Sequence, residues 1–404
     1  KVPHLRFPEF HGEWEKCKVS DLLDFYSTNS LSWDQLEYGT DNMLNLHYGL
    51  IHVGLPTMVD LSKDILPAIK KENEPKNFEL CKEGDIAFAD ASEDTNEVAK
   101  AIEFYTLEDK AVVCGLHTIH GRDKSNKTVV GYKGYAFSST AFHHQIRRIA
   151  QGTKIYSISA KNFAECYIGI PSKEEQTRIV KLLRLIDERI ATQSKLIEDL
   201  KKLKSAIIDY AINSHDTDFA KFGSLYEMAG EGGTPTTSNA SFYDNGKIPF
   251  IKIDDLKKKY LTKNKDFITE LGLQKSSAWL VPTRSILFSN GATIGEITIT
   301  TYPVCTKQGI LGIVPKPNID VEFLYYFMSS SYFKKAVSRI VTEGTMKTVY
   351  LKDINNIRCP IPTKEKQLDI AKMPSALNSK IDFEQSILKL FGSQKQYLLR
   401  QMFM

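Results

Sequence analysis

The chain has 404 residues, of which 42% are hydrophobic and 25% are charged, and its formal net charge at pH 7 is +4. These values describe an ordinary globular protein of a size that suits two domains. It has no run of about eighteen apolar residues and no signal-like start, so we expect a cytoplasmic protein without a membrane partner. The six cysteines lie far apart without a Cys-x-x-Cys pair, which argues against a disulfide scaffold and a zinc ribbon. Because the chain begins at Lys1, we expect a few native residues to precede it.

Residues 1–172 are predicted to form a first globular domain. The stretches 84–89, 111–114 and 154–156 are predicted to be short strands, and 139–150 is predicted to be a helix. Three potential metal ligands of this domain lie three residues apart, namely Cys114, His117 and His120. No fourth ligand is evident, so we expect no metal site.

Charge is distributed unevenly along this first domain. Residues 1–121 carry 11 Lys/Arg against 22 Asp/Glu, whereas residues 122–161 carry eight Lys/Arg against Asp123 alone. Tyrosine and phenylalanine alternate with the basic residues, which is typical of a surface that meets a polyphosphate backbone. A solvated basic face with aromatic side chains in the core explains the pattern equally well. The candidate DNA-binding residues of this stretch are Arg122, Lys124, Lys127, Lys133, His143, Arg147 and Lys154.

Two long helices are predicted, over 173–213 and over 364–404, with a second domain over 214–363 between them. Their starts share one motif, Ile-Pro-Ser-Lys-Glu-Glu-Gln at 170–176 and Ile-Pro-Thr-Lys-Glu-Lys-Gln at 361–367. Ser172 and Glu175 are spaced as a capping box. Apolar residues then recur at alternating steps of four and three, which predicts one seam per helix for pairing with another helix. The predicted pairing residues are Ile179, Ile186, Ile190, Ile197, Leu200 and Ile207 in the first helix, and Ile370, Leu377, Ile381, Leu388, Phe391 and Leu398 in the second.

The second domain is predicted to contain strands at 247–256, 284–288, 296–300 and 310–314 and an amphipathic helix over 320–339. It opens with a glycine-rich loop at 230–236, which favours a surface turn over a phosphate cradle because the nucleotide-binding spacing is absent. Polar side chains on loops between rigid strands are suited to reading base edges. The candidate DNA-binding residues of this domain are Thr234, Lys252, Asn290, Thr293, Lys307, Gln308 and Lys347.

The sequence lacks several common catalytic motifs. There is no Asn-Pro-Pro-aromatic or Asp-Pro-Pro-aromatic run, no Walker lysine loop and no His-Glu-x-x-His motif. We therefore expect a binding protein without catalytic residues.

Several of these motifs together resemble the specificity subunit of type I restriction–modification systems. They are the two helix starts, Gly-Gly-Thr-Pro at 232–235, Ile-Pro-Phe at 248–250 with Asp-Asp-Leu at 254–256, Gly-Ala-Thr-Ile-Gly at 291–295 and Thr-Lys-Gln-Gly at 306–309. The resemblance implies an α+β protein: two mixed α/β target recognition domains separated by two long helices, which pack as an antiparallel coiled coil in a pseudo-twofold internal repeat.

The same resemblance implies a function and a set of partners. Each recognition domain would read one half of a gapped, bipartite site in double-stranded DNA. Two modification (methyltransferase) subunits would methylate adenine with S-adenosylmethionine, and restriction subunits would translocate and cleave with ATP and Mg²⁺, so this chain itself would bind no cofactor. Two other functions stay open at this point, namely a stand-alone DNA-binding adaptor and a protein-binding scaffold, both without methyltransferase partners.

Overall fold

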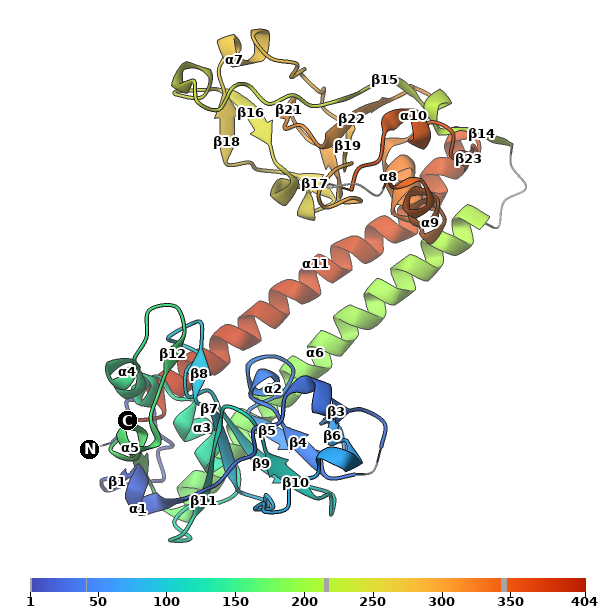
Figure 1. Cartoon of the computed structure of the whole chain (residues 1–404). Helices are drawn as coiled ribbons and strands as arrows, with labels where there is room; N and C mark the ends of the chain where they lie inside the picture. The colour runs from blue at the N-terminus through green and yellow to red at the C-terminus, as the bar shows by residue number, and fades with distance from the viewer. Residues whose placement is uncertain (1, 41, 214–217, 343–346) are drawn as a thin grey trace. The chain divides into compact units, whose positions relative to one another are not determined.

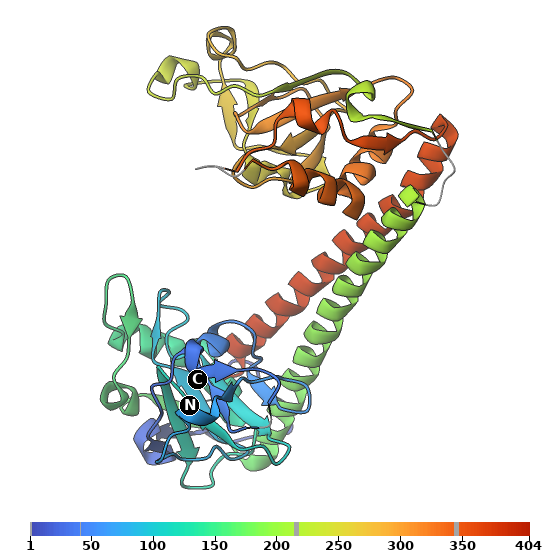
Figure 2. The ribbon, with the colours of Figure 1, turned by 45° about the vertical axis from the view of Figure 1, so that its right-hand side comes forward.

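The computed structural model describes residues 2–40, 42–213, 218–342 and 347–404. The chain divides into two compact units (Figure 1). Unit 1 comprises Lys1–Ser194 and Ser386–Met404, and unit 2 comprises Lys195–Gln385. The first and last segments therefore both belong to unit 1, where Figure 2 places them close together and the N–H of Leu5 donates to the carbonyl of Gln401 at 2.9 Å. None of the described helices is both long and apolar enough to cross a lipid bilayer.

The main sheet of unit 1 has five strands in the order β2-β11-β7-β9-β5. They are β2 (Leu23–Tyr26), β11 (Thr118–Asp123), β7 (Ile86–Ala89), β9 (Ala101–Thr106) and β5 (Met58–Asp60). Neighbours run antiparallel except β5 and β9, which are parallel. A four-stranded sheet contains β10 (Val112–Cys114), β4 (Leu44–Leu46), β6 (Ala68–Ile69) and β3 (Leu36–Glu37), with β10 and β4 parallel. Two strand pairs complete the unit, β1 (Glu15–Lys18) with β13 (Tyr167–Ile170) and β12 (Tyr156–Ser157) with β8 (Ala91–Ser92).

The main sheet is buried on both faces. Ile86 and Phe88 of β7 pack into one apolar cluster, whereas Ala87 and Ala89 pack into another. Successive side chains of a strand point to opposite faces, so a strand covered on both sides needs the unbroken apolar run seen here. The helices of the unit are α1 (Val19–Leu22), α2 (Tyr48–His52), α3 (Tyr132–Phe137), α4 (Thr140–Ile149) and α5 (Ala160–Ala164).

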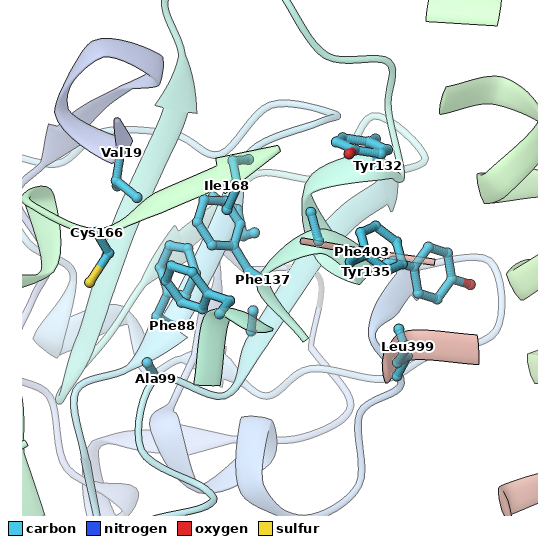
Figure 3. Close-up of a cluster of buried hydrophobic side chains, with 14 of the residues drawn as sticks. Val19, Phe88, Ala99, Tyr132, Tyr135, Phe137, Cys166, Ile168, Leu399 and Phe403 are labelled. Carbon is cyan, nitrogen blue, oxygen red and sulfur yellow. The ribbon is translucent and has the colours of Figure 1, made fainter. Parts of the chain in front are cut away.

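Figure 3 shows the first of these clusters, in which Phe88 and Phe137 lie beside Tyr132 and Tyr135 of α3. The last residues of the chain are part of the same core. The ring of Phe403 lies 5.9 Å from that of Tyr132 and 6.4 Å from that of Trp14. The C-terminus is therefore built into unit 1.

Unit 2 repeats the strand arrangement of unit 1. Its main sheet has the order β15-β22-β19-β20-β17, with β17 parallel to β20 and the other pairs antiparallel. These strands are β15 (Tyr226–Glu231), β22 (Ile310–Pro315), β19 (Ile286–Ser289), β20 (Ile297–Thr300) and β17 (Tyr260–Leu261). A smaller sheet contains β18 (Asp266–Ile268), β16 (Ile248–Ile251) and β21 (Cys305–Thr306), with β16 and β21 parallel as β4 and β10 are. Strand β14 (Phe219–Lys221) pairs with β23 (Arg358–Pro360), as β1 pairs with β13.

Two expectations for unit 2 need correction. The stretch 247–256 is a strand only as far as Ile251, and a 3₁₀ helix over Ile253–Lys257 follows. The stretch 320–339 forms two helices, α8 (Val321–Ser329) and α9 (Ser331–Ile340), because Ser330 adopts an extended backbone and its hydroxyl accepts from the N–H of Phe333. Helices α7 (Glu270–Gln274) and α10 (Leu351–Ile354) complete the unit.

The predicted long central helix is confirmed as α6 (Lys173–Asn213), and α11 runs from Lys364 to Gln401. Half of the predicted capping box is present, since the hydroxyl of Ser172 accepts from the N–H of Glu175 at 3.3 Å. The carboxylate of Glu175 is used differently from the expectation: both its oxygens accept from Arg6, at 2.7 Å each, and one also accepts from Trp14. Glu175 thereby anchors the N-terminal segment instead of completing the cap.

The last residue of each shared motif explains why the motif is repeated. Gln176 and Gln367 are buried, and each clamps the loop that precedes a helix of its own unit. The side-chain amide of Gln176 donates to the carbonyls of Lys127 and Pro171 and accepts from the N–H of Val129. Gln367 makes the equivalent bonds to the carbonyls of Asn318 and Pro362 and to the N–H of Asp320. The motif therefore ties the start of a long helix to the globular part of each unit.

Candidate nucleic-acid interface

Loops of unit 2 converge where β15 ends, β19 ends and β22 begins. The hydroxyl of Thr234 accepts from the N–H of Gln308 at 3.3 Å, and the N–H of Asn290 donates to the carbonyl of Gly309 at 3.0 Å. The N–H of Lys307 donates to Ile251, which brings the end of β16 to the same place. A further strand-like bridge joins Gly291 to Thr348. The predicted loop residues of the second domain are thus brought together on one surface, which we call the unit 2 loop surface (residues 231–236, 252, 290–295, 307–309 and 347–348).

Most of the predicted side chains on this surface are accessible. Lys307, Gln308, Thr293 and Lys347 are exposed. Lys252 is also exposed, with its ammonium 2.8 Å from a carboxylate oxygen of Asp266. Lysine ammonium groups, an amide and hydroxyl groups in this setting can contact phosphates and base edges.

Asn290 is the exception among the predicted residues of unit 2. Its side chain is only 2% exposed, and its amide donates to the carbonyl of Val349 at 3.2 Å. Because Asn290 also bonds Gly309 and Val349 through its main chain, it joins the loops to one another. In this structure its role is therefore to position the surface, and it has no path to DNA.

The glycine-rich loop at 230–236 is tightly packed, in contrast to the flexible surface turn that we expected. A Cβ atom on Gly232 would lie 2.2 Å from the carbonyl oxygen of Thr306, and one on Gly233 would lie 2.4 Å from the amide nitrogen of Ala278. Both contacts are with backbone, which cannot give way. The two glycines therefore let the loop cross its neighbours closely enough to present Thr234.

The basic stretch of unit 1 does not form one surface. Arg122, at the end of β11, binds Asp85 through two nitrogens at 2.8 Å each and Glu79 through a third at 2.6 Å. The hydrogen bonds that Arg122 donates to Asp85 raise the pKa of the guanidinium, which is therefore charged and held by its partners. Lys124 and Lys127 lie at the same end, where Lys124 donates to the carbonyl of Ser20 and Lys127 to Glu15. These three cations lie at or just after the C-terminal end of β11, away from Thr118 where the strand begins.

Lys133 is part of the core. Its side chain is 2% exposed, its ammonium lies 2.9 Å from Glu103, and it donates to the hydroxyl of Thr128 at 3.0 Å. Burial raises the pKa of Glu103, and the nearby ammonium counteracts that rise. The sequence predicts Lys133 as a DNA-binding residue, but it and its neighbours in α3 are all buried. It cannot contact DNA in this conformation.

His143, Arg147 and Lys154 lie at the other end of the main sheet, beside the loop 90–97. Arg147 donates to Asn96 at 2.9 Å, and with His143 and Lys100 it lines a cavity of about 410 Å³. Burial lowers the pKa of His143, whose imidazole is therefore neutral at pH 7. Lys154 is exposed and precedes Ile155, which lines a second cavity of about 600 Å³ with Tyr48 and His117.

The internal repeat identifies this end of unit 1 as the equivalent of the unit 2 loop surface. The N–H of Asp90 donates to the carbonyl of His117 at 3.1 Å, as Asn290 donates to Gly309. His117 and Gly309 also share a left-handed backbone, with φ values of 54° and 90°. The unit 1 loop surface, comprising residues 27–30, 90–97 and 115–117 with His143, Arg147 and Lys154, therefore occupies the corresponding place.

Sequence reasoning did not assign His117 of this surface, or Tyr48 beside it, to a DNA contact. His117 and Tyr48 stack edge to face at 5.3 Å, and both line the larger cavity. The side chain of His117 is half exposed and bonds Asp90 at 3.1 Å. The signal that could have found His117 is the order of the strands, because the residues between β10 and β11 correspond to those between β21 and β22.

Comparison with known proteins gives the same family for both units. The family model for the type I restriction modification DNA specificity domain matches residues 12–202 and 215–390. The specificity subunit of the type I restriction enzyme MjaIX from Methanocaldococcus jannaschii is 29% identical over 170 residues, which cover 41% of this chain and 39% of that relative. The putative MjaX specificity subunit of the same organism is 23% identical over 399 residues, covering 93% of this chain and 89% of the relative.

A solved structure agrees in fold. It belongs to a study of complex assembly and conformational transition of the type I restriction–modification system, and it aligns with a TM-score of 0.61 at 14% identity over 99% of this chain and 97% of the other. The two matches of the family model coincide with the two repeated units and leave little of the chain outside them. The chain belongs to the family of type I restriction–modification DNA specificity proteins.

Proposed function

We propose that this chain is the specificity subunit of a type I restriction–modification complex, and that each unit reads one half of a gapped, bipartite site in double-stranded DNA. The observation that carries the proposal is the repeat: both units have the same strand order and present exposed polar loops at the same end of the main sheet. Two equivalent reading surfaces in one chain are what a two-part site requires, as in other two-headed DNA-binding proteins.

The two long helices support a spacer between the two reading surfaces. In unit 1, Lys395 of α11 lies 2.6 Å from Asp187 of α6, and in unit 2, Lys204 of α6 donates to Asn378 of α11 at 3.1 Å. The first contact joins the first half of α6 to the second half of α11, and the second contact joins the second half of α6 to the first half of α11. This is the pairing of an antiparallel coiled coil. Each of the predicted pairing residues of α6 and α11 is buried or half-buried. We propose that the helices form this coiled coil and set the number of unread base pairs.

The catalytic work is assigned to partners. Two modification subunits would bind this chain and methylate adenine with S-adenosylmethionine after flipping the base out of the duplex. Restriction subunits would add cleavage that depends on ATP and Mg²⁺. This chain would supply the DNA sequence preference and bind none of these cofactors.

The experiment is adenine methylation mapped across a genome that expresses the chain with its methyltransferase partner. We expect one gapped motif with a methylated adenine in each half, and no motif when the chain is omitted. The double variant Lys307→Ala, Gln308→Ala should lose or relax one half of the motif only. Lys316→Ala removes an exposed lysine at the other end of β22 and should leave both halves unchanged.

Three other outcomes would refute parts of the proposal. Sequence-specific DNA binding without methylation in a stable complex would favour a stand-alone adaptor. Weak binding that is indifferent to sequence would favour a protein scaffold. A Lys307→Ala, Gln308→Ala variant that methylates the complete motif at the normal level would show that this loop surface does not read DNA.

A further inference from the structure

Three side chains with metal-binding atoms meet inside unit 1. The sulfurs of Cys81 and Cys114 and a ring nitrogen of His120 lie within 4.8 Å of one another, and all three residues are buried. They come from separate strands and segments: Cys114 ends β10, His120 lies in β11, and the N–H of Cys81 donates to Val112 of β10 at 2.8 Å. The fold, not the local sequence, brings them together.

The imidazole of His120 is oriented as a metal ligand would be. One ring nitrogen, Nε2, lies 2.8 Å from a carboxylate oxygen of Asp85. The other, Nδ1, is buried and has no hydrogen-bond partner among the residues that the structure describes. When Nε2–H donates to Asp85, Nδ1 carries a free lone pair inside the protein, and leaving such a group unpaired is costly. Metal-bound histidines commonly donate their second N–H to a carboxylate in this way.

The carboxylate behind His120 is itself fixed. Asp85 is 1% exposed, and it accepts from two nitrogens of Arg122 and from the N–H of Lys82. Arg122, predicted from the sequence to contact DNA, thus holds the group that orients His120.

The distance between the two sulfurs suits a shared metal. The Sγ atoms of Cys81 and Cys114 are 3.6 Å apart. Two thiolates bound at about 2.3 Å to a tetrahedral zinc ion lie about 3.8 Å apart. A disulfide needs about 2.05 Å between the sulfurs, so the pair is not in disulfide geometry.

We propose that Cys81, Cys114 and His120 bind a zinc ion inside unit 1. Two thiolates neutralise the dication, a neutral imidazole adds no charge, and Asp85 is balanced by Arg122. Thiolate and imidazole ligands together suit zinc better than magnesium or calcium, which prefer oxygen. Three protein ligands leave one position of the tetrahedron for a ligand outside this set.

The ion would be bound between the two layers of unit 1. It would connect β10 of the four-stranded sheet to β11 of the main sheet and bracket the loop 115–117, which lies between two of its ligands in the sequence. That loop carries His117 of the unit 1 loop surface. Zinc would thereby hold a proposed DNA-reading loop in place, although zinc binding itself does not depend on the proposed function.

The test uses the full chain, purified under reducing conditions, loaded with Zn²⁺ or Co²⁺ and dialysed against metal-free buffer. We expect about one metal ion per chain by elemental analysis. The cobalt form should show a thiolate-to-cobalt charge-transfer band and the intense visible bands of a tetrahedral ion. Cys81→Ser and Cys114→Ser should each reduce retained metal at least tenfold, whereas Cys166→Ser, which alters another buried thiol of unit 1, should retain it.

The spectrum of the unmodified chain keeps the test decisive even where a serine variant fails to fold. Absence of retained metal together with absence of the charge-transfer band would overturn the proposal, as would a disulfide between Cys81 and Cys114 in the loaded protein. Equal loss of metal in Cys166→Ser would show that the loss reflects unfolding and not the removal of a ligand. DNA binding is measured separately, so a protein that holds zinc but ignores DNA sequence would refute the proposed function alone.

Discussion

Replacing Gln367 by alanine tests the idea that the repeated helix-start motif ties each long helix to its own unit. The substitution removes three hydrogen bonds, to the carbonyls of Asn318 and Pro362 and from the N–H of Asp320, at 3.2, 2.9 and 2.7 Å. Since Gln367 is 1% exposed, water has little access to the groups left behind. An unpaired buried polar group costs about 1–3 kcal/mol, so the loss of local stability should be about 3 kcal/mol or more.

Hydrogen exchange detects this loss within unit 2 without assuming that the whole chain unfolds in one step. A loss of about 3 kcal/mol corresponds to exchange about 100-fold faster in peptides that cover 318–324 and the start of α11. Gln176→Ala should have the same effect around 127–132 in unit 1, where the equivalent bonds are made. Gln274→Ala, at an exposed position at the end of α7, is the matched control. Exchange that is unchanged in both motif variants would refute the interpretation of the motif as a clamp.

Four further predictions follow from the contacts in the two units. Lys133→Met should destabilise unit 1 by about 3–5 kcal/mol in chemical denaturation because it leaves the carboxylate of Glu103 buried without a counter-charge. Adding Glu103→Leu should restore most of the loss, and no difference between the single and double variants would contradict this. Lys307→Ala should reduce the slope of log K against log salt concentration by about one in DNA-binding titrations, and Lys316→Ala should not. Burial opposes the ionised form of Asp123, but hydrogen bonds from Thr128 and Ser125 lower its pKa below 3.8. Its contribution to stability is therefore present above pH 3.8 and is lost as the pH falls through the folded pKa. In urea titrations at a series of pH values, Asp123→Asn should reduce this loss of stability at acid pH. Inserting four residues, about 6 Å of helix, at the same level of α6 and α11 should lengthen the gap in the methylated motif by one or two base pairs, and an unchanged gap would refute the spacer.

The features that the sequence predicts well are those set by residues close together in the chain. The start of α6, the apolar runs of β7 and β19 and the helix α4 all follow from local spacing, and the structure confirms them. The single predicted helix over 320–339 fails for a local reason too: Ser330 offers a cap in mid-stretch, and Asp209 of α6 secures the break by accepting from the N–H and hydroxyl of Ser331. The serine is visible in the sequence, but its partner is 122 residues away.

The candidate site could be predicted only in part because charge and accessibility depend on distant partners. Lys133 and Lys307 cannot be told apart by residue type. Lys133 is buried and paired with Glu103, whereas Lys307 is exposed on a loop. The even spacing of Cys114, His117 and His120 does not show which of these side chains meet. The structure groups Cys114 and His120 with Cys81, because His117 lies in the loop before β11 with a left-handed backbone and bonds Asp90 instead. In both cases the decisive residue lies about thirty positions upstream, since Glu103 is paired with Lys133 and Cys81 with Cys114 across neighbouring elements. The internal repeat supplies what local spacing lacks. Because β10 and β21 hold the same place in the two units, the loop that follows one identifies the loop that follows the other, even though their residues share no chemistry.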